Sequence, residues 1–158
     1  MVKAAVMWAF NEPLKIDSLK LKAPREDEVV VRVAASGVCH SDLHQIRDEW
    51  GGAIFPMVPG HEIVGRIIKV GSNVQKFKSG ELAGIGCFVD SCRTCANCKA
   101  GIEQYCEKGM SGTYNSYERD GKTPTYGGYS TKIVVDENYV LRISDKLPLT
   151  GVAPLLCA

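Results

Sequence analysis

Four of the seven cysteines in this 158-residue chain lie close together and are spaced like the ligands of a metal ion. They occur in the segment CRTCANCKAGIEQYC, as Cys92, Cys95, Cys98 and Cys106. Intervals of two residues let neighbouring sulfur atoms meet around one tetrahedral ion, and four thiolates leave zinc no open coordination position. The spacing therefore predicts a structural zinc site, which cross-links its own loop and does not bind a substrate.

Other occupants of this cysteine cluster fit the sequence less well. A ferredoxin motif also begins with three cysteines at this spacing but continues with a shorter interval and a proline, whereas here seven residues precede Cys106 and Glu107 follows it. A disulfide framework is typical of small secreted domains, and the N-terminal MVKAAVMWAF is too short for a signal peptide with a cleavage site. A nucleic-acid-binding zinc ribbon would have basic flanks, yet this loop offers only Arg93 and Lys99.

A second set of possible ligands is scattered along the chain, as Cys39 in GVCHSDLH, His61 in PGHEIVG and Cys157 in APLLCA. Taken singly, such residues are more often buried in a core or placed in a turn. Together, two thiolates and one imidazole form a ligand set that leaves zinc a position for a substrate oxygen. The remaining cysteine, Cys87, lies in the apolar run LAGIGCFV, and we expect it to be a small buried side chain.

The composition indicates an ordinary globular protein, with 45% hydrophobic and 23% charged residues and a formal net charge of +1. Such a balance gives no long-range field that would favour nucleic acid or an anionic membrane as a partner. The sequence contains no run of apolar residues long enough to span a bilayer. We therefore expect a cytoplasmic protein that binds neither nucleic acid nor a membrane.

Short strands separated by glycine turns dominate the predicted secondary structure. Runs rich in β-branched residues predict strands at 3–8, 14–22, 28–35, 62–70, 82–86, 129–135 and 139–143. Helix is predicted only as a turn at 41–45 and as a segment that begins at residue 147. This pattern is typical of a mainly β protein with an irregular β-barrel. Residues 88–125 interrupt the pattern, and we expect them to form a lobe that a metal ion holds together.

Three segments contain the possible ligands: GVCHSDLHQIRDEWGGAIFPMVPGHEIVG, the cysteine loop and the terminal APLLCA. Together with SGTYNS, which follows the loop, they resemble the zinc-dependent medium-chain alcohol dehydrogenases, in the branch named for cinnamyl alcohol dehydrogenase. The resemblance covers essentially the whole chain and departs in small details such as Gly80-Glu81, where relatives more often have Gly-Asp. It implies that residues 1–158 form one GroES-like catalytic domain. The Rossmann coenzyme domain that normally follows is absent here, and no G-x-G-x-x-G fingerprint occurs in the chain.

The resemblance also implies roles for individual residues. Cys39, His61 and Cys157 match the ligands of a catalytic zinc, and the cysteine cluster matches the ligands of a structural zinc. Ser41 and His44 match a relay that carries a proton between the substrate oxygen and solvent.

Five neighbouring positions match the family as well. Glu62 resembles a glutamate of the catalytic site that lies behind the zinc. Asp42 is suited to fix the ligating imidazole, because such rings usually donate their second N–H to a carboxylate. His40 matches a position near the coenzyme pyrophosphate, and Trp50 and Phe88 match positions that line the substrate pocket.

The function that the resemblance implies is the interconversion of primary alcohols and aldehydes by hydride transfer, with NADP(H) favoured over NAD(H) for this branch. It implies two zinc ions per chain, a small alcohol or aldehyde as substrate, and a homodimer for the full-length enzyme. Because the chain ends at Ala158, we expect a fragment with little turnover of its own, in which zinc is held weakly beside the terminal Cys157.

Two other functions stay open at this stage. The first is a stand-alone GroES-like zinc domain with a binding role, which would be expected to cap its last helix, whereas PLLCA has no cap. The second, more remote alternative is an iron–sulfur electron carrier, which would be recognised by its brown colour.

Overall fold

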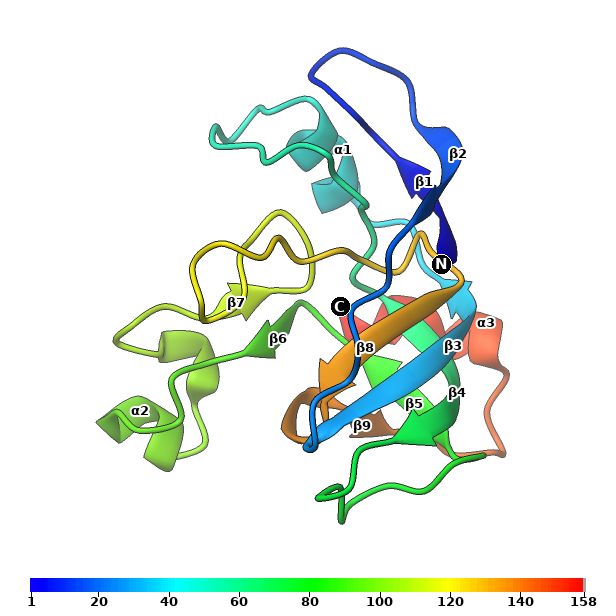
Figure 1. The fold of residues 1–158 in the computed structure, drawn as a ribbon, viewed down its shortest axis with the longest axis vertical. Helices are drawn as coiled ribbons and strands as arrows, with labels where there is room; N and C mark the ends of the chain where they lie inside the picture. Colours follow the sequence, from blue (N-terminus) through cyan, green and yellow to red (C-terminus); the bar gives the residue numbers. More distant parts are fainter. Residues whose placement is uncertain (158) are drawn as a thin grey trace.

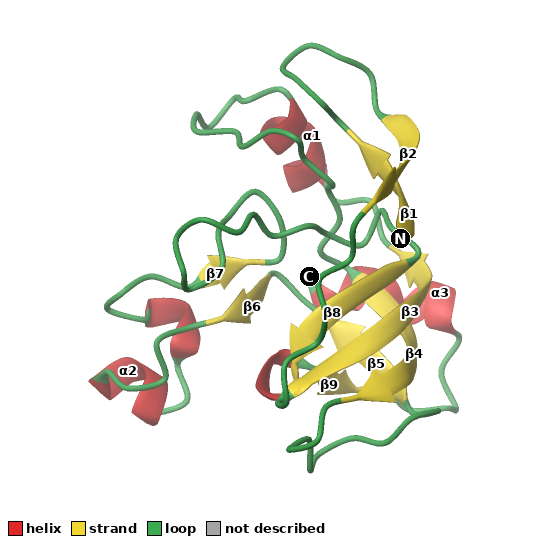
Figure 2. Ribbon diagram, viewed as in Figure 1, coloured by secondary structure: helices red, strands yellow, loops and turns green. Residues whose placement is uncertain are grey.

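The computed structural model describes residues 1–157, and its main body is a five-stranded antiparallel sheet (Figures 1 and 2). In the order β8-β3-β4-β5-β9, the strands are β8 (Lys132–Asp136), β3 (Glu28–Ser36), β4 (Ile63–Val70), β5 (Leu82–Ile85) and β9 (Leu141–Arg142). Their β-branched side chains alternate between the two faces of the sheet and bury one core. This core includes Val29, Val31, Ile63, Ile67 and Ile85. The prediction of a mainly β fold is confirmed.

Two smaller sheets adjoin the main one. The strands β1 (Val2–Val6) and β2 (Lys15–Leu19) form a hairpin at one end of the molecule (Figure 1). The strands β6 (Phe88–Asp90) and β7 (Ser111–Gly112) pair where the cysteine-bearing segment leaves the sheet. All seven predicted strands are therefore present.

Several of these strands are shorter than the sequence predicts, among them β2, which spans Lys15–Leu19 where the sequence predicts 14–22. Strand β8 begins at Lys132 and not at residue 129, because the preceding residues turn back across the molecule. Tyr129 there donates its N–H to the carbonyl oxygen of Pro59 at 2.9 Å. Strand β9 has two residues, because the turn η2 (Glu137–Tyr139) occupies the start of the predicted segment.

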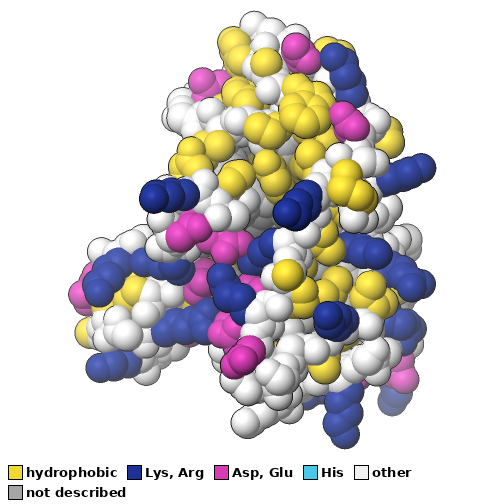
Figure 3. Space-filling model, in the orientation of Figure 1, with side chains coloured by type: hydrophobic (Ala, Val, Ile, Leu, Met, Phe, Trp, Pro, Cys, Tyr) yellow, Lys and Arg dark blue, Asp and Glu magenta, His cyan; other side chains and the backbone are white. Residues whose placement is uncertain are grey.

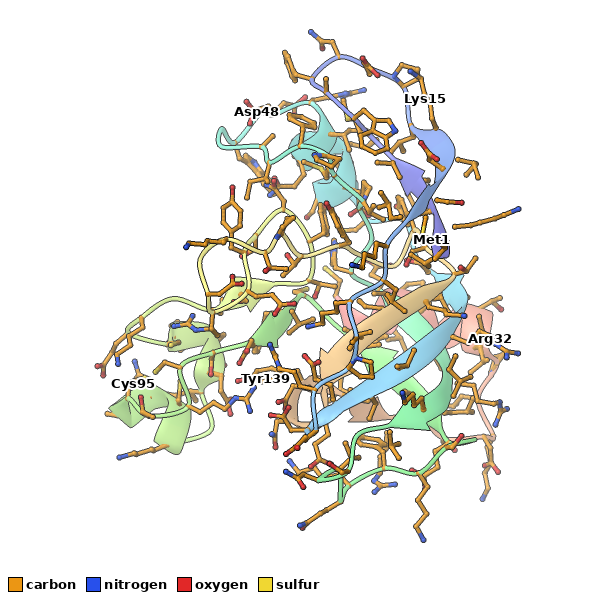
Figure 4. The ribbon with its side chains drawn as sticks, in the orientation of Figure 1. Met1, Lys15, Arg32, Asp48, Cys95 and Tyr139 are labelled. Carbon is orange, nitrogen blue, oxygen red and sulfur yellow. The ribbon has the colours of Figure 1, made fainter. Side chains whose placement is uncertain are left out.

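Residues 88–125 form the predicted lobe, which projects from the sheet (Figure 1). Its cysteine-bearing part contains the short helices α2 (Ala96–Lys99) and η1 (Glu103–Tyr105). The hydrophobic cluster that this part buries consists of its four cysteines alone. Figure 4 shows Cys95 at the outer end of the lobe, far from Lys15 in the hairpin. With so little buried apolar surface, this segment depends on the restraint that a metal ion would supply.

A buried carboxylate fastens the return segment of the lobe to the sheet. Glu28 is 1% exposed and accepts contacts of 2.8 Å from both Lys22 Nζ and the Arg25 guanidinium. The same two cations reach Glu118 in the lobe, at 2.5 and 3.0 Å. Because a buried charge needs such partners, this network fixes how the two parts of the chain are joined.

Helices are short and lie at the periphery of the sheet. Helix α1 (His40–Ile46) is the predicted turn, extended by one residue at each end. The predicted C-terminal helix is found as one α-turn, α3 (Leu149–Val152), followed by the 3-10 helix η3 (Ala153–Leu156), and its last predicted residue, 158, lies outside the described part of the chain. Val152 packs against the sheet. No helix within residues 1–157 is long and apolar enough to cross a membrane.

The surface carries charges of both signs. Figure 3 shows Lys and Arg side chains beside Asp and Glu side chains over the lower part of this face, while hydrophobic side chains gather over its upper part. The exposed residues of the hairpin include Trp8, Phe10 and Ile16. On this face, therefore, the basic side chains do not gather into a separate patch.

Candidate metal centre and adjoining pocket

The scattered ligands converge in space although 118 residues separate the first from the last. Cys39 precedes α1, His61 precedes β4, and Cys157 follows η3. One ligand atom from each of these residues, together with one from Glu62, lies within 4.8 Å of all the others. The two sulfur atoms of Cys39 and Cys157 are 3.8 Å apart. Sheet, loop and C-terminal turn thus place two sulfurs, one imidazole and one carboxylate around a common point.

Asp42 lies beside the possible ligands and contacts two of them, Cys39 and His61. Its buried carboxylate accepts the N–H groups of Cys39 at 3.1 Å and Gly60 at 3.2 Å and the hydroxyl of Tyr129 at 2.9 Å. The same carboxylate lies 3.3 Å from Nδ1 of His61. Since Nδ1–H then donates to Asp42, the lone pair on Nε2 is left for a metal ion.

The charges of Asp42 and His61 stabilise each other. The hydrogen bond to Asp42 raises the pKa of His61 above its ordinary value. Burial raises the pKa of Asp42, but hydrogen bonds, first among them that from His61, outweigh burial and lower it. The carboxylate is therefore ionised at neutral pH, as a group that orients a ligand must be.

The two thiols differ in acidity. Burial raises the pKa of Cys39, but hydrogen bonds from Ser41 outweigh it and lower the pKa below the ordinary value. Burial and the neighbouring Cys39 raise the pKa of Cys157 to about 12. A divalent cation would favour the thiolate form of both groups. Two sulfurs and an imidazole with an oriented tautomer suit zinc, so the residues present fit a zinc ion.

Glu62 lies nearer to the possible metal ligands than the resemblance implied, which placed it behind the zinc. Its side chain is buried, and one carboxylate oxygen belongs to the same cluster as the other three ligand atoms. Gly37 makes room for it, because a Cβ added at Gly37 would lie 1.8 Å from Oε2 of Glu62. The backbone N–H of Gly37 also donates to the carbonyl oxygen of Glu62 at 2.8 Å.

A cavity of about 410 Å³ opens beside the ligands. Its wall combines aromatic, sulfur-containing and polar side chains, and its lining includes Ser41, Gln45, Trp50, Tyr114 and Asn115. Four site residues predicted from the sequence are therefore found at the cavity: Ser41, Trp50, His61 and Cys157. A mixed wall with a few polar groups next to a metal site is the usual form of a small-molecule pocket.

One expectation is wrong, and one predicted residue lies outside this cavity. Phe88 does not line the cavity; it packs edge-on against Tyr139, with ring centroids 5.8 Å apart, in a neighbouring hollow that Cys87 also lines. Cys87 is exposed and not buried, and its side chain lines the cavity. Cys87 is exposed because it lies between two strands: β5 ends at Ile85 and β6 begins at Phe88, so Cys87 belongs to neither.

The two histidines of α1 lie at the outer side of the site. His44 pairs through Nδ1 with the carboxylate of Glu49 and stacks on Trp50, with ring centroids 4.8 Å apart. The hydrogen bond with His44 lowers the pKa of Glu49. His40 is exposed, and its ring centroid lies 4.8 Å from that of His44. His40 does not line the cavity.

Sequence reasoning missed Gln45, Tyr114 and Asn115 as wall residues. The ring of Tyr114 stacks on the ligand His61, with centroids 5.8 Å apart. Its hydroxyl is buried and has no hydrogen-bond partner of good geometry within the described residues. Tyr114 and Asn115 belong to SGTYNS, which indicated only a family branch, so the signal lay in that motif.

The clustered cysteines also meet in space. Their four sulfur atoms lie within 4.8 Å of one another. Backbone N–H groups point at three of these sulfurs, from Cys95 to Cys92 at 3.4 Å, from Cys98 to Cys95 at 3.5 Å and from Cys92 to Cys106 at 3.4 Å. Such hydrogen bonds, with that of Thr94 the largest, lower the pKa of Cys92 to about 5. Four sulfur atoms this close together, three of them facing backbone N–H groups, fit a zinc ion.

Arg93 connects this metal loop with the main sheet. Its guanidinium lies 2.8 Å from Asp90 and 2.9 Å from Asp136, and 5.3 Å from the centroid of the Tyr139 ring. Figure 4 shows Tyr139 at the junction of lobe and sheet. Asp136 is 2% exposed whereas the Arg93 side chain is 37% exposed, so this half-buried ion pair couples the lobe to β8.

Asp136→Asn should lower the free energy of unfolding by about 1–3 kcal/mol at neutral pH. Burial raises the pKa of Asp136, but the N–H of Asn138 and the charge of Arg93 outweigh burial and lower it. A carboxyl with a depressed folded-state pKa contributes stability above its unfolded pKa, about 3.9, and loses it as the pH falls through the folded-state value.

Urea unfolding at a series of pH values checks this expectation. The difference between the wild type and Asp136→Asn should shrink as the pH is lowered past the ordinary carboxyl pKa. Asp17→Asn, on the exposed strand β2, is the matched control and should change little. A difference that is the same at every pH would contradict the role assigned to Arg93 and Asn138.

Comparison with known proteins identifies the family of this chain. The profile of the alcohol dehydrogenase GroES-like domain matches residues 25–145. The chain is 55% identical over 158 residues to NADP-dependent alcohol dehydrogenase C 1 of Mycolicibacterium smegmatis, covering 99% of this chain and 45% of the relative. It is 49% identical, with the same coverage, to the aldehyde reductase YahK of Escherichia coli. The chain thus spans about half the length of these curated relatives.

Solved structures agree in fold. A cinnamyl alcohol dehydrogenase from Sorghum bicolor has a TM-score of 0.94 at 41% identity, covering 99% of this chain and 44% of that one. The cinnamyl alcohol dehydrogenase of Helicobacter pylori, complexed with NADP(H), has a TM-score of 0.94 at 43% identity, covering 99% and 45%. The predicted GroES-like fold is confirmed, and residues 1–157 contain no Rossmann fold. The chain belongs to the zinc-dependent alcohol dehydrogenase family and corresponds to its GroES-like domain.

Proposed function

We propose that this chain is the zinc-binding catalytic domain of an enzyme that interconverts primary alcohols and aldehydes with NADP(H). The observation that carries the proposal is the convergence of Cys39, His61 and Cys157 beside a cavity of about 410 Å³. In the direction of oxidation, the alcohol carbon transfers a hydride to NADP⁺ and the hydroxyl releases one proton. The choice of NADP(H) is supported by the NADP-dependent relative in M. smegmatis and by the H. pylori structure, which is complexed with NADP(H).

Zinc, when bound, would supply a Lewis acid that lowers the pKa of an oxygen ligand. The chain's own residues prepare that chemistry. Asp42 holds the ligating ring of His61 in one tautomer, and the buried carboxylate of Glu62 adds negative charge at the ligands. Trp50 and Tyr114 supply the apolar wall against which a substrate can lie.

A proton leaving the cavity can follow helix α1. Ser41 reaches the cavity wall, and His44 lies one helical turn further on, so both side chains lie on adjacent parts of one face. Glu49 pairs with His44 and would stabilise its protonated form. We assign the relay to Ser41 and His44. We propose contact with the coenzyme for the exposed His40, which has no place at the cavity.

Two zinc ions per chain follow from the two ligand sets, one catalytic and one structural. The homodimer and the cytoplasmic location expected for the longer protein rest on the family resemblance alone and stay predictions.

Joining the chain to the coenzyme domain of the M. smegmatis relative provides the test. The fusion should reduce a primary aldehyde with NADPH, and Cys39→Ser should abolish this activity, with a loss of at least about a thousandfold, because it removes a ligand of the catalytic ion. The same variant should lose one of two bound zinc ions and keep the other. A folded fusion with two zinc ions and no alcohol-dependent reduction of NADP⁺ would refute the assignment.

A further inference from the structure

Asn115 joins two separate parts of the cavity wall. Its side-chain Oδ1 accepts the backbone N–H of Ile54 at 2.7 Å, and its Nδ2 donates to Oε1 of Gln45 on α1. Asn115 and Gln45 both line the cavity. Asn115 has φ +50°, in the left-handed region that asparagine and aspartate occupy more readily than other side chains. The cavity wall therefore contains two linked amide side chains, Asn115 and Gln45, and the first of them is held by the backbone N–H of Ile54.

The backbone N–H of Ile54 determines how both amide side chains are oriented. The oxygen and nitrogen of an amide side chain are normally assigned from their partners, and the partner here is unambiguous, because the backbone N–H of Ile54 can only donate. Asn115 must therefore turn its oxygen to Ile54 and its NH₂ to Gln45. Gln45 must in turn offer Oε1 to Asn115, which leaves its own NH₂ as the outward group.

Within residues 1–157, that outward NH₂ group has no hydrogen-bond partner. Among the described residues, no hydrogen bond uses Nε2 of Gln45, and the atom is not sealed from solvent. Gln45 lies one helical turn beyond Ser41 on α1, about 6 Å along the axis. Trp50 and Tyr114 line the space beside them. A substrate whose reacting oxygen lies at Ser41 would thus bring its far end to an N–H donor.

We propose that Asn115 is a positioning residue that fixes Gln45 as a hydrogen-bond donor, so that the cavity selects alcohols and aldehydes with an acceptor oxygen at the end remote from the reacting carbon. The biological meaning of this specificity rests on the proposed function. Its test measures binding and does not require turnover. An ether, a carbonyl or a hydroxyl oxygen would satisfy the donor, whereas a hydrocarbon of equal size would leave it unpaired.

Three aldehydes of nearly equal shape test the proposal with the zinc-loaded chain. At the ring position opposite the aldehyde, 4-methoxybenzaldehyde carries a hydrogen-bond acceptor, 4-ethylbenzaldehyde carries neither acceptor nor donor, and 4-(methylamino)benzaldehyde carries a donor. The wild type should bind the methoxy compound about three- to tenfold more tightly than the ethyl compound, as one added hydrogen bond allows. In ¹⁵N-resolved NMR spectra, the side-chain NH₂ signal of Gln45 should shift with the methoxy compound and not with the ethyl compound.

The variant Asn115→Asp should reverse this preference. Aspartate tolerates the same backbone conformation and still accepts from Ile54, but its second oxygen accepts where asparagine donated. Gln45 must then turn its NH₂ to Asp and its Oε1 to the cavity, so the methylamino compound should bind more tightly than the methoxy compound. Gln45→Leu should bind all three alike, and it separates this effect from a general loss of the pocket.

Equal affinities of the wild type for the three aldehydes would overturn the inference, as would an Asn115→Asp variant that keeps the preference of the wild type. Failure to bind any of the three at millimolar concentration would also overturn it. These outcomes differ from a failure of the proposed function: a fusion with two zinc ions and NADP(H)-dependent turnover but no discrimination leaves the dehydrogenase intact and removes only the role of Asn115.

Discussion

Cys106→Ser is expected to unfold the cysteine-bearing part of the lobe, residues 92–106, while the main sheet stays folded. The sulfur of Cys106 completes the cluster of four, and the hydrophobic cluster in this part of the lobe contains nothing but those cysteines. Zinc binding to such sites is worth about 10–16 kcal/mol, which is comparable to the whole stability of a domain, about 5–15 kcal/mol. Without its fourth ligand, the loop has too little buried surface to stay ordered.

Hydrogen exchange and metal analysis together check this result. Backbone amides of α2 and η1 should lose their protection, those of β3 and β4 should keep theirs, and the zinc content should fall by one ion per chain. Cys87→Ser is the matched control, because Cys87 is exposed and lies outside both ligand sets, so protection and zinc content should stay unchanged. Protected lobe amides in Cys106→Ser would show that packing and not metal holds the lobe.

Asp42→Asn should weaken zinc binding at the scattered site by about 10- to 100-fold, as removal of a carboxylate that supports a ligating histidine generally does. It should also lower the free energy of unfolding by about 1–3 kcal/mol. Asp42 accepts from Cys39, Gly60, Tyr129 and His61 at once. Asparagine has one acceptor oxygen, so its NH₂ group would face donors in a buried place.

Competition with a chelator and urea unfolding measure the two effects. The affinity of the cysteine cluster should not change, because Asp42 does not contact it. Asp145→Asn, at an exposed position, controls for the change of charge and should leave both quantities unaltered. Unchanged affinity at the scattered site in Asp42→Asn would contradict the role of this carboxylate in orienting His61.

Much of this arrangement was predictable from local patterns. The segment EVVVRVAA predicted a buried strand because β-branched residues of this density favour one, and β3 occupies it. The interval between cysteines predicted the lobe, since short intervals can be closed by one ion. The pairing of Asp42 with the ligating imidazole was expected on chemical grounds, and the two groups lie 3.3 Å apart.

What stayed hidden depends on residues that are distant in the sequence. Cys87 appeared buried because its neighbours are apolar, yet its exposure is decided by where β5 ends. Phe88 was matched to the pocket by resemblance, yet its ring packs against Tyr139, a residue distant in the sequence, and lies outside the cavity. The contact of Asn115 with Gln45 spans 70 residues, and no local pattern reports such a pairing.

The most direct test of the central claim is elemental analysis of zinc and iron in the purified, dialysed 158-residue chain. Two ligand sets predict two zinc ions per chain and no iron, with Cys39→Ser removing one ion and Cys106→Ser removing the other. A wild type that holds one zinc ion, with the same zinc content in Cys39→Ser, would mean that Cys39, His61 and Cys157 do not bind metal. Iron in place of zinc would contradict the dehydrogenase assignment altogether.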